Sequence, residues 1–151
     1  MNFETPKLAV DCIVLVPGGI VLIERKWPPL GFAIPGGFVD VGETLAAAAK
    51  REMKEELNLD VEILGQLGVY DDPKRDPRKH VVSVVFVGKS QGQPVAGDDA
   101  NKCHVIKIAG ISDMNKFPVE LAFDHKQILQ DYIKSGYPKI LVDDWIKQNF
   151  S

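Results

Sequence analysis

Short apolar runs, rich in valine and isoleucine and separated by glycines and prolines, predict a series of β-strands along the chain. Residues 8–16 and 20–26 are two such runs, and Pro17-Gly18-Gly19 predicts a tight turn between them. Residues 27–30 contain two prolines and are expected to form a loop. Further strands are expected at residues 32–34, where Pro35-Gly36-Gly37 would end the strand, and at 81–87 and 103–108, while residues 61–70 predict a strand or a bent pair of strands.

The pattern becomes helical at residues 44–57, which include four consecutive alanines and neither glycine nor proline. We expect Thr44 to be the N-cap of this helix and Asn58 to adopt a left-handed conformation at its end. Apolar residues recur at every fourth position and are expected to face the core: Leu45, Ala49, Met53 and Leu57.

Residues 122–135 and 139–150 predict two further helices, whereas residues 71–79 and 91–101 are polar and predict loops. Helices at separated points around a strand-rich middle predict a mixed β-sheet flanked by α-helices, in the α/β (α+β) class. The length of 151 residues suits a single domain that spans residues 1–151.

Composition narrows the range of partners. The formal net charge is -3 and the pI is about 5.6, which argues against non-specific binding of nucleic acid. No apolar run is long enough to cross a bilayer, and the N-terminus does not resemble a signal peptide. The two cysteines, Cys12 and Cys103, lack the spacing of a metal-binding pair. We therefore expect a cytoplasmic location and neither a nucleic-acid nor a membrane partner.

Three glutamates crowd one side of the predicted helix, opposite its apolar stripe. Glu52 and Glu56 are four residues apart and Glu55 follows Glu52 by three, so the like charges repel by a few tenths of a kcal/mol per pair. A bound cation would remove this repulsion, and carboxylate oxygens suit Mg²⁺ or Mn²⁺ better than zinc. The alternative interpretation is a solvated acidic face paired with nearby lysines.

The residues before the helix favour the metal-site interpretation. The glycines of Pro35-Gly36-Gly37 let the backbone approach a ligand closely. Glu43 stands at the helix entrance, and Arg51 within the helix can form forked hydrogen bonds that hold carboxylates in place.

Gly37, Glu43 and the run Arg51-Glu52-Met53-Lys54-Glu55-Glu56-Leu57-Asn58-Leu59 closely resemble the Nudix box. Every position of that family pattern matches except Asn58, where the family usually has glycine, and asparagine is the next-best residue for a left-handed turn. The resemblance implies the Nudix fold, a mixed β-sheet sandwiched between α-helices.

The same resemblance implies Mg²⁺-dependent hydrolysis, with Mn²⁺ as an alternative ion, of a nucleoside diphosphate linked to another group. By family pattern Glu52 and Glu56 are metal ligands, Glu55 ligates or supports a second ion, and the Gly37 carbonyl completes the shell. Glu43 and Arg51 would brace the glutamates. The general base is expected to be Glu52 or a residue of the polar loop that holds Asp98 and Asp99, unless that pair is only a solvated turn.

Residues 72–86, together with residues 23–26 and 122–125, resemble the ADP-ribose pyrophosphatases of bacteria and archaea. That subgroup implies conversion of ADP-ribose to AMP and ribose 5-phosphate by a homodimer. Arg75 and Arg78 would bind a phosphate or ribose, or else lie on a charged surface loop. Phe38 and Tyr70, with Trp27, would stack on adenine or serve as structural contacts. The three histidines, His80, His104 and His125, lack metal-ligand spacing and are expected to be structural.

Two other functions compete with this one. The first is a Nudix hydrolase of (deoxy)nucleoside triphosphates or dinucleotide polyphosphates. The second is a module that binds ADP-ribose without cleaving it, which the full set of glutamates and the lack of room for a helix-turn-helix domain disfavour. Because Glu56 is expected to face solvent and metal, Glu56→Gln should lower turnover far more than stability.

Overall fold

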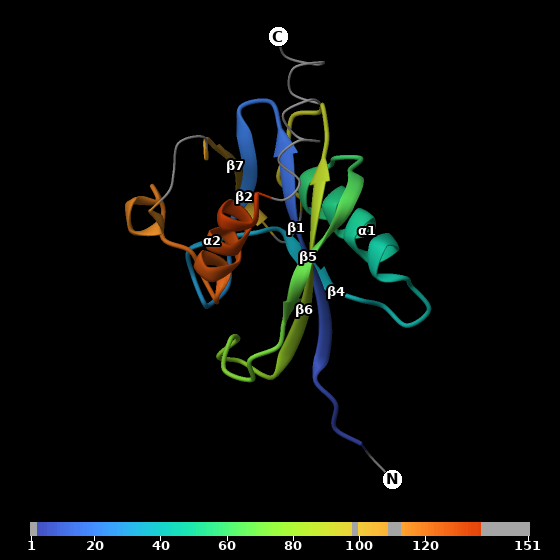
Figure 1. The fold of residues 1–151 in the computed structure, drawn as a ribbon. Helices are drawn as coiled ribbons and strands as arrows, with labels where there is room; N and C mark the ends of the chain where they lie inside the picture. The colour runs from blue at the N-terminus through green and yellow to red at the C-terminus, as the bar shows by residue number, and fades with distance from the viewer. Residues whose placement is uncertain (1–2, 98–99, 109–112, 137–151) are drawn as a thin grey trace.

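A mixed β-sheet forms the centre of the protein (Figure 1). The computed structural model describes residues 3–97, 100–108 and 113–136. The strands in these ranges are β1 (Lys7–Val16), β2 (Gly19–Arg25), β3 (Phe32–Ala33), β4 (Gly36–Phe38), β5 (Glu62–Tyr70), β6 (Val81–Lys89) and β7 (Ala100–Ile106). They follow the order β3-β2-β1-β6-β5, while β4 pairs with β1 and β7 pairs with β2. Because β1 and β6 are parallel and the other pairs antiparallel, the predicted mixed sheet is confirmed.

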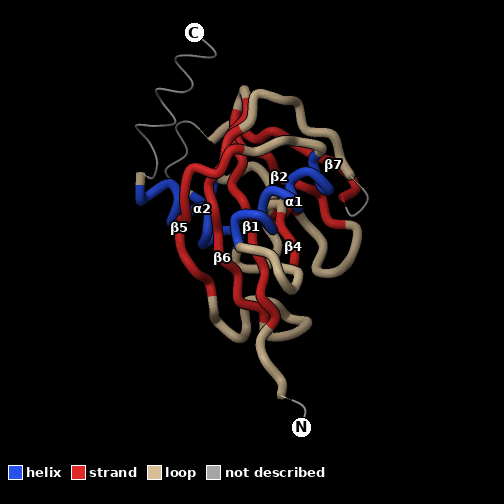
Figure 2. Tube along the Cα trace, turned by 90° about the vertical axis from the view of Figure 1, so that its right-hand side faces the viewer, coloured by secondary structure: helices blue, strands red, loops and turns tan. Residues whose placement is uncertain are grey.

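Two α-helices, α1 (Leu45–Leu57) and α2 (His125–Ser135), lie on opposite faces of this sheet (Figures 1 and 2). A short 3-10 helix, η1 (Met114–Lys116), precedes α2 and contributes Met114 to the core on the same face. None of these described helices is long and apolar enough to cross a membrane. The arrangement confirms the expected fold class.

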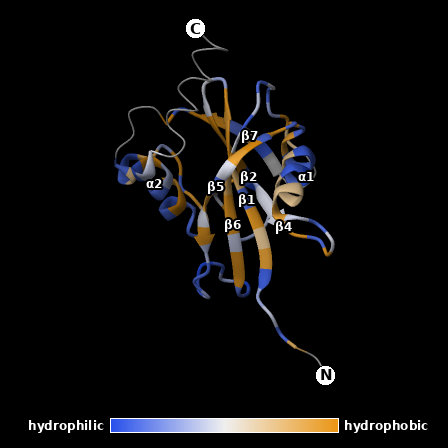
Figure 3. Ribbon diagram, turned by 45° about the vertical axis from the view of Figure 1, so that its right-hand side comes forward, coloured by the Kyte–Doolittle hydropathy of each residue, from blue (hydrophilic) through white to orange (hydrophobic). Residues whose placement is uncertain are grey.

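Side chains of β1 alternate between the two faces of the sheet. Val10, Cys12 and Val14 pack in the core that α1 covers, whereas Ile13 and Leu15 pack in the core that α2 covers. Figure 3 shows apolar strands between helices whose outer faces are hydrophilic. A strand buried on both faces reads as a continuous apolar run, which is why this one lacks the usual alternation. Asp11 interrupts the run and is nevertheless buried.

The α1 helix begins and ends as the sequence predicts. The Oγ1 atom of Thr44 accepts a hydrogen bond from the Ala47 amide at 3.1 Å. Asn58 adopts the left-handed conformation, with φ 56°, and its amide donates to the Lys54 carbonyl at 3.0 Å. Its side chain also donates to the Val95 carbonyl at 2.9 Å, so asparagine at this position ties the helix end to the loop that follows β6.

Several boundaries differ from the prediction. Gly36 and Gly37 were expected to end the preceding strand, but they form part of β4 and pair with β1. β7 begins three residues earlier than predicted, at Ala100 rather than Cys103. α2 begins at His125 rather than Ala122, because the left-handed Phe123 cannot continue a helix. The predicted helix at 139–150 lies outside the described residues.

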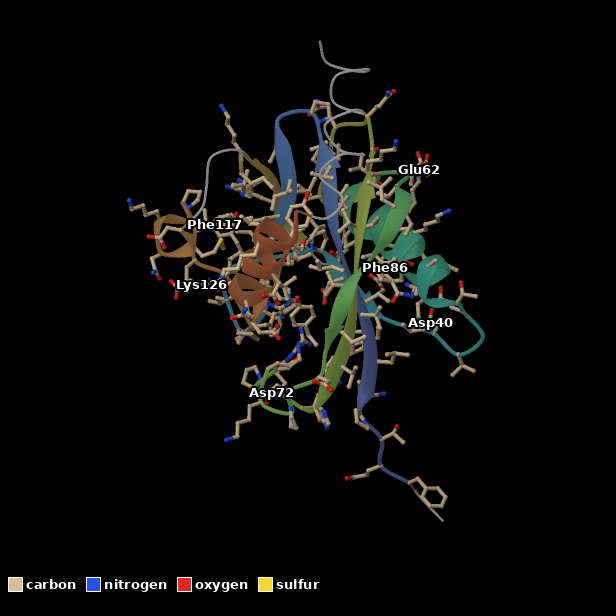
Figure 4. All side chains as sticks on the ribbon, viewed as in Figure 1. Asp40, Glu62, Asp72, Phe86, Phe117 and Lys126 are labelled. Carbon is tan, nitrogen blue, oxygen red and sulfur yellow. The ribbon has the colours of Figure 1, made fainter. Side chains whose placement is uncertain are left out.

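Two loops extend the lower half of the sheet on either side (Figure 4). Asp40 lies in the loop that leads into α1, and Asp72 lies in the loop that follows β5. The first loop brings the two glycines of β4 to the acidic helix. The second carries the arginines of residues 72–79 toward the start of α2, where Arg75 pairs with Asp124.

Candidate active site

Arg51 is the hub of the acidic helix. Its guanidinium forks onto Glu43, with Nε 2.7 Å from Oε2 and Nη2 2.8 Å from Oε1. Nη1 donates to Glu52 at 2.9 Å and lies 3.3 Å from a Glu55 oxygen. Nη2 also donates to the Phe38 carbonyl at 3.0 Å. One cation therefore joins two of the three helix glutamates to the strand that precedes the helix.

The contact with Arg51 has a clear electrostatic consequence for Glu43. Hydrogen bonds from the Arg51 guanidinium, and then from the Asp40 amide, lower the pKa of Glu43 to about 2. Glu43 therefore stays ionised across the physiological range and holds the Arg51 side chain in one orientation.

The two glycines of β4 lie directly against carboxylates. A Cβ atom on Gly37 would overlap the Glu52 carboxylate, and a Cβ atom on Gly36 would overlap the Asp11 side chain and the Val10 carbonyl. Any other residue at these positions would displace an acidic side chain. The glycines thus bring the backbone of β4 within contact of the acidic group, as the sequence suggested.

The three glutamates of α1 differ in how far they are exposed. Glu56 is only 7% exposed, so the expectation that its side chain faces solvent is wrong. The last turn of α1 is covered by residues 95–97, whose amides donate to the Leu57 carbonyl at 2.8 Å and the Glu56 carbonyl at 2.7 Å. The Glu52 side chain is 13% exposed, whereas that of Glu55 is 60% exposed.

A cavity of about 280 Å³ lies beside this acidic helix. Gly37, Glu52 and Glu56 line it, and Glu55 is not part of its wall. The same cavity is lined by three arginines from β2 and the 72–79 loop, namely Arg25, Arg75 and Arg78. One cavity therefore presents both carboxylates, which attract cations, and guanidinium groups, which attract anions.

The predicted substrate-binding residues differ in their surroundings. Arg75 is forked onto Asp124 at 2.9 and 2.8 Å, and its side chain is 5% exposed. Arg78 is forked onto Asp76 at 3.0 and 2.8 Å but keeps 44% of its side chain exposed. Phe38 also lines the cavity. Both arginines are thus held by neighbouring carboxylates and still reach the cavity wall.

Tyr70 lies away from the cavity wall, where its hydroxyl donates to Asp131 at 2.8 Å. Asp98 and Asp99, the alternative source of a general base, lie outside the described residues. Neither observation places these predicted residues at the site.

Two further buried groups of the cavity wall, Asp11 and His125, were not predicted to belong to the site. Asp11 accepts a hydrogen bond from the Ser83 hydroxyl, and burial raises its pKa to about 6. His125 accepts a hydrogen bond from the Ile34 amide at Nδ1, over 2.9 Å, and burial together with Arg75 and Arg25 lowers its pKa to about 3. The sequence does carry one signal for Asp11, because an acid inside a strand buried on both faces needs a special reason.

Asp11→Asn is expected to stabilise the metal-free chain more as the pH rises. Folding raises the pKa of Asp11 from 3.8 to about 6. The neutral carboxyl therefore makes its full contribution to the free energy of unfolding below pH 3.8, and this contribution is lost as the pH rises through about 6. This loss amounts to about 3 kcal/mol, and the asparagine does not suffer it. Urea unfolding of both chains with a chelator, at intervals from pH 4 to 8, measures the difference. A difference that stays constant with pH would contradict this account of Asp11.

The fold and the cavity together define an α+β protein with an acidic helix beside a site of mixed charge. The chain belongs to the NUDIX domain family, whose model matches residues 5–132, and it is a hydrolase of that family. The Nudix prediction made from the sequence is confirmed.

Characterised relatives are similar over most of the chain. An ADP-ribose pyrophosphatase of Methanocaldococcus jannaschii is 46% identical over 132 residues, which cover 85% of this chain and 74% of the relative. An ADPR responsive transcriptional repressor of Acinetobacter baylyi is 30% identical over 141 residues, covering 85% of this chain and 54% of the repressor.

Solved structures share the fold. A MutT/nudix family protein from Enterococcus faecalis superposes with a TM-score of 0.77 at 28% identity, covering 91% of this chain and 64% of that one. A bifunctional NMN adenylyltransferase/ADP ribose pyrophosphatase from Francisella tularensis, in complex with AMP and a Mn ion, gives 0.75 at 28% identity. That comparison covers 89% of this chain but only 43% of the larger protein.

Proposed function

We propose that this chain hydrolyses ADP-ribose to AMP and ribose 5-phosphate with the help of Mg²⁺. The observation that carries the proposal is the single cavity that Gly37, Glu52 and Glu56 share with three arginines. The similarity to the ADP-ribose pyrophosphatase of Methanocaldococcus jannaschii supports the choice of substrate.

The residues present fit a hard divalent cation. The acidic side of the cavity offers oxygen donors, and the absence of a side chain at Gly37 lets the Glu52 carboxylate lie against the backbone. Among the described residues, no three His, Cys, Asp or Glu side chains are gathered as a ready-made metal shell. Glu52, Glu56 and the Gly37 carbonyl would therefore share an ion with water and substrate oxygens, as is common for Mg²⁺.

When bound, the metal would neutralise the diphosphate and lower the pKa of an attacking water. Arg51 would hold Glu52 in place through the 2.9 Å contact with its Oε1. Glu52 lines the cavity and can accept the proton of the water, and Asp98 or Asp99 is the alternative base. Glu55, which lies on the exposed side of α1 beside Arg51, would support a second ion.

The nucleoside half of the substrate would occupy the aromatic part of the cavity. Trp27 and Phe38 both line it and are 68% and 38% exposed. Because the Lys79 Nζ atom lies 4.8 Å from the centre of the Phe38 ring, Trp27 offers the more open ring surface for a base to stack on. A drug-sized ligand commonly fills 300–1,000 Å³ of pocket, so we expect ADP-ribose to fill this open cavity of about 280 Å³ and to extend beyond it along the exposed sides of these rings.

A panel of nucleotides tests the proposal. ADP-ribose, nucleoside triphosphates and dinucleotide polyphosphates are incubated with the chain and Mg²⁺, Mn²⁺ or a chelator, and the products are separated by chromatography. We expect AMP and ribose 5-phosphate from ADP-ribose with either ion and no turnover with the chelator. Turnover of triphosphates alone would replace this function with that of another Nudix hydrolase.

A second candidate is binding of ADP-ribose without cleavage. The observation that favours it is the 30% identity with the ADPR responsive transcriptional repressor of Acinetobacter baylyi. Saturable binding of ADP-ribose in calorimetry, with no AMP released in the presence of Mg²⁺ or Mn²⁺, would select this function instead.

A homodimer remains a prediction from the sequence resemblance, and a cytoplasmic location remains a prediction from the composition and the N-terminal sequence. Light scattering coupled to size-exclusion chromatography would measure the mass in solution, which is 16.7 kDa for one chain.

A further inference from the structure

Phe123 adopts a backbone conformation that bulky residues rarely take. Its φ is 55°, and among the described non-glycine residues only Asn58, which ends α1, shares a positive value. Such conformations persist where the surrounding structure holds them, and they gather at ligand sites. The Phe123 side chain lines the cavity at the entrance to α2.

Two guanidinium groups hold the Phe123 ring. The Cζ atom of Arg25 lies 4.6 Å from the ring centre and that of Arg78 lies 5.4 Å from it. The Arg25 Nε atom donates to the Pro29 carbonyl at 2.6 Å, and Asp76 fixes Arg78. The proximity of Arg78 contributes to the lowered pKa of Arg25, after burial, so the two cations repel one another. A negatively charged ligand that contacts both guanidinium groups would relieve this repulsion.

His125 adds an uncharged donor to the same wall. Because its Nδ1 accepts the Ile34 amide, the ring proton of the neutral imidazole resides on Nε2. His125 is buried and lines the cavity, and its ring centre lies 5.2 Å from that of Phe123. We call Arg25, Arg78, Phe123 and His125 the donor wall.

The chemistry of the donor wall suits a sugar phosphate better than a base. The guanidinium groups and the imidazole supply N–H donors, and the oxygens of the adjacent Asp76 already accept from Arg78. The Phe123 ring is covered by guanidinium at 4.6 Å, whereas Trp27 elsewhere in the cavity leaves most of its surface open. Hydroxyl and phosphoryl oxygens are acceptors that match such a wall.

We propose that the donor wall binds the ribose 5-phosphate half of the substrate and so selects nucleoside diphosphate sugars. This assignment rests on the proposed hydrolysis of ADP-ribose, and it fixes the orientation of the substrate in the cavity. Arg25, Phe123 and His125 become specificity-determining residues, each from a part of the chain outside the acidic helix.

Binding of the two product halves tests the orientation without turnover. Ribose 5-phosphate, AMP and inorganic phosphate are titrated separately into the metal-free chain and followed by ligand-observed NMR. We expect Arg25→Met to weaken ribose 5-phosphate about ten- to hundredfold, the range for a lost charge-assisted hydrogen bond, and to leave AMP unchanged. Arg25→Lys, which keeps the charge but loses the fork, is expected to recover part of the binding.

Two further variants separate recognition from folding. Phe123→Asn removes the ring but tolerates the left-handed backbone, so it should also weaken ribose 5-phosphate. Lys74→Met removes an exposed cation from the same 72–79 loop, outside the cavity wall, and should bind both halves like the wild type. In turnover assays Arg25→Met should raise KM for ADP-ribose more than it lowers kcat.

Several outcomes overturn the assignment. They are loss of AMP rather than ribose 5-phosphate binding in Arg25→Met, equal binding of inorganic phosphate and ribose 5-phosphate, and no saturable binding of ribose 5-phosphate by the wild type. If both Arg25→Met and Phe123→Asn hydrolysed ADP-ribose with an unchanged KM, the assignment of the donor wall would be wrong while the proposed function would stand. If ribose 5-phosphate binding depended on both residues but the chain did not hydrolyse ADP-ribose, the donor wall would stand and the proposed function would be wrong.

Discussion

Glu56→Gln is expected to lower kcat/KM for ADP-ribose about a thousandfold, which corresponds to about 4 kcal/mol of transition-state stabilisation. Glutamine keeps the shape of the side chain but cannot supply the negative charge that a divalent cation requires. Steady-state assays of AMP release at saturating Mg²⁺ measure the loss. Turnover equal to that of the wild type would remove Glu56 from the mechanism.

The stability of the same variant should respond in a different way. Glu56 is almost fully buried, and glutamine spares the cost of burying a charge, so the free energy of unfolding without metal should change by about 1 kcal/mol or less. In the wild type Mn²⁺ should raise Tm, because it binds only the folded chain, and Glu56→Gln should lose that rise.

Glu62→Gln provides the matched control for this experiment. Its side chain lies on β5, is 70% exposed and touches only the Lys89 side chain, at 3.7 Å, among the described ion pairs. The same loss of one charge there should alter neither turnover nor the effect of Mn²⁺, because exposed ion pairs contribute little.

The acidic helix could be predicted because its information is local. Thr44, the apolar spacing and Asn58 each act within a few residues, and the structure bears out both ends of α1. Leu45 is the exception in the predicted stripe, since it is only partly buried while Ala48 is fully buried. Because both ends of this thirteen-residue helix are capped by residues of the same segment, its bounds depend little on contacts with the rest of the chain.

The remainder of the site depends on contacts between distant segments. β4 contains three residues, two of them glycines, and becomes a strand only because it pairs with residues 9–11 of the distant β1. Glu56 is buried where the last turn of α1 meets residues of β1, β2 and β4 in the cavity wall. Neither the pairing of β4 with β1 nor the burial of Glu56 follows from a local sequence pattern. The sequence therefore predicted the end of a strand at the glycines and an exposed glutamate.

The basic part of the cavity illustrates the same limit. Arg25 ends β2, Arg78 follows β5, and Phe123 precedes α2. These residues are far apart in the sequence and come into contact only when the sheet is assembled and α2 has packed against it. The resemblance to ADP-ribose pyrophosphatases covered all three segments, but of these three residues only Arg78 was assigned a role from the sequence. Sequence reasoning could find these segments, but the tertiary fold was needed to show that two guanidinium groups contact the Phe123 ring.

Gly37→Ala is expected to lower kcat for ADP-ribose about a hundredfold while the fold survives. The added Cβ would overlap the Glu52 carboxylate, which lies at the end of a flexible side chain and can move aside. A displacement of about 1 Å at a reacting group commonly costs about a hundredfold in rate. The stability should change little, because the atoms nearest to the added Cβ belong to the Glu52 side chain. Urea unfolding measured beside the turnover assay checks both parts.

Gly68→Ala is the matched control, since a Cβ there meets only the Tyr70 ring, at an ordinary 3.8 Å. The decisive comparison is a double-mutant cycle between Gly37→Ala and Glu52→Gln. If the alanine acts by displacing Glu52, the double variant should be no slower than Glu52→Gln alone, because a carboxylate already neutralised cannot be lost again. Losses that simply multiply would show that Gly37 acts independently of Glu52, through its carbonyl or the course of β4.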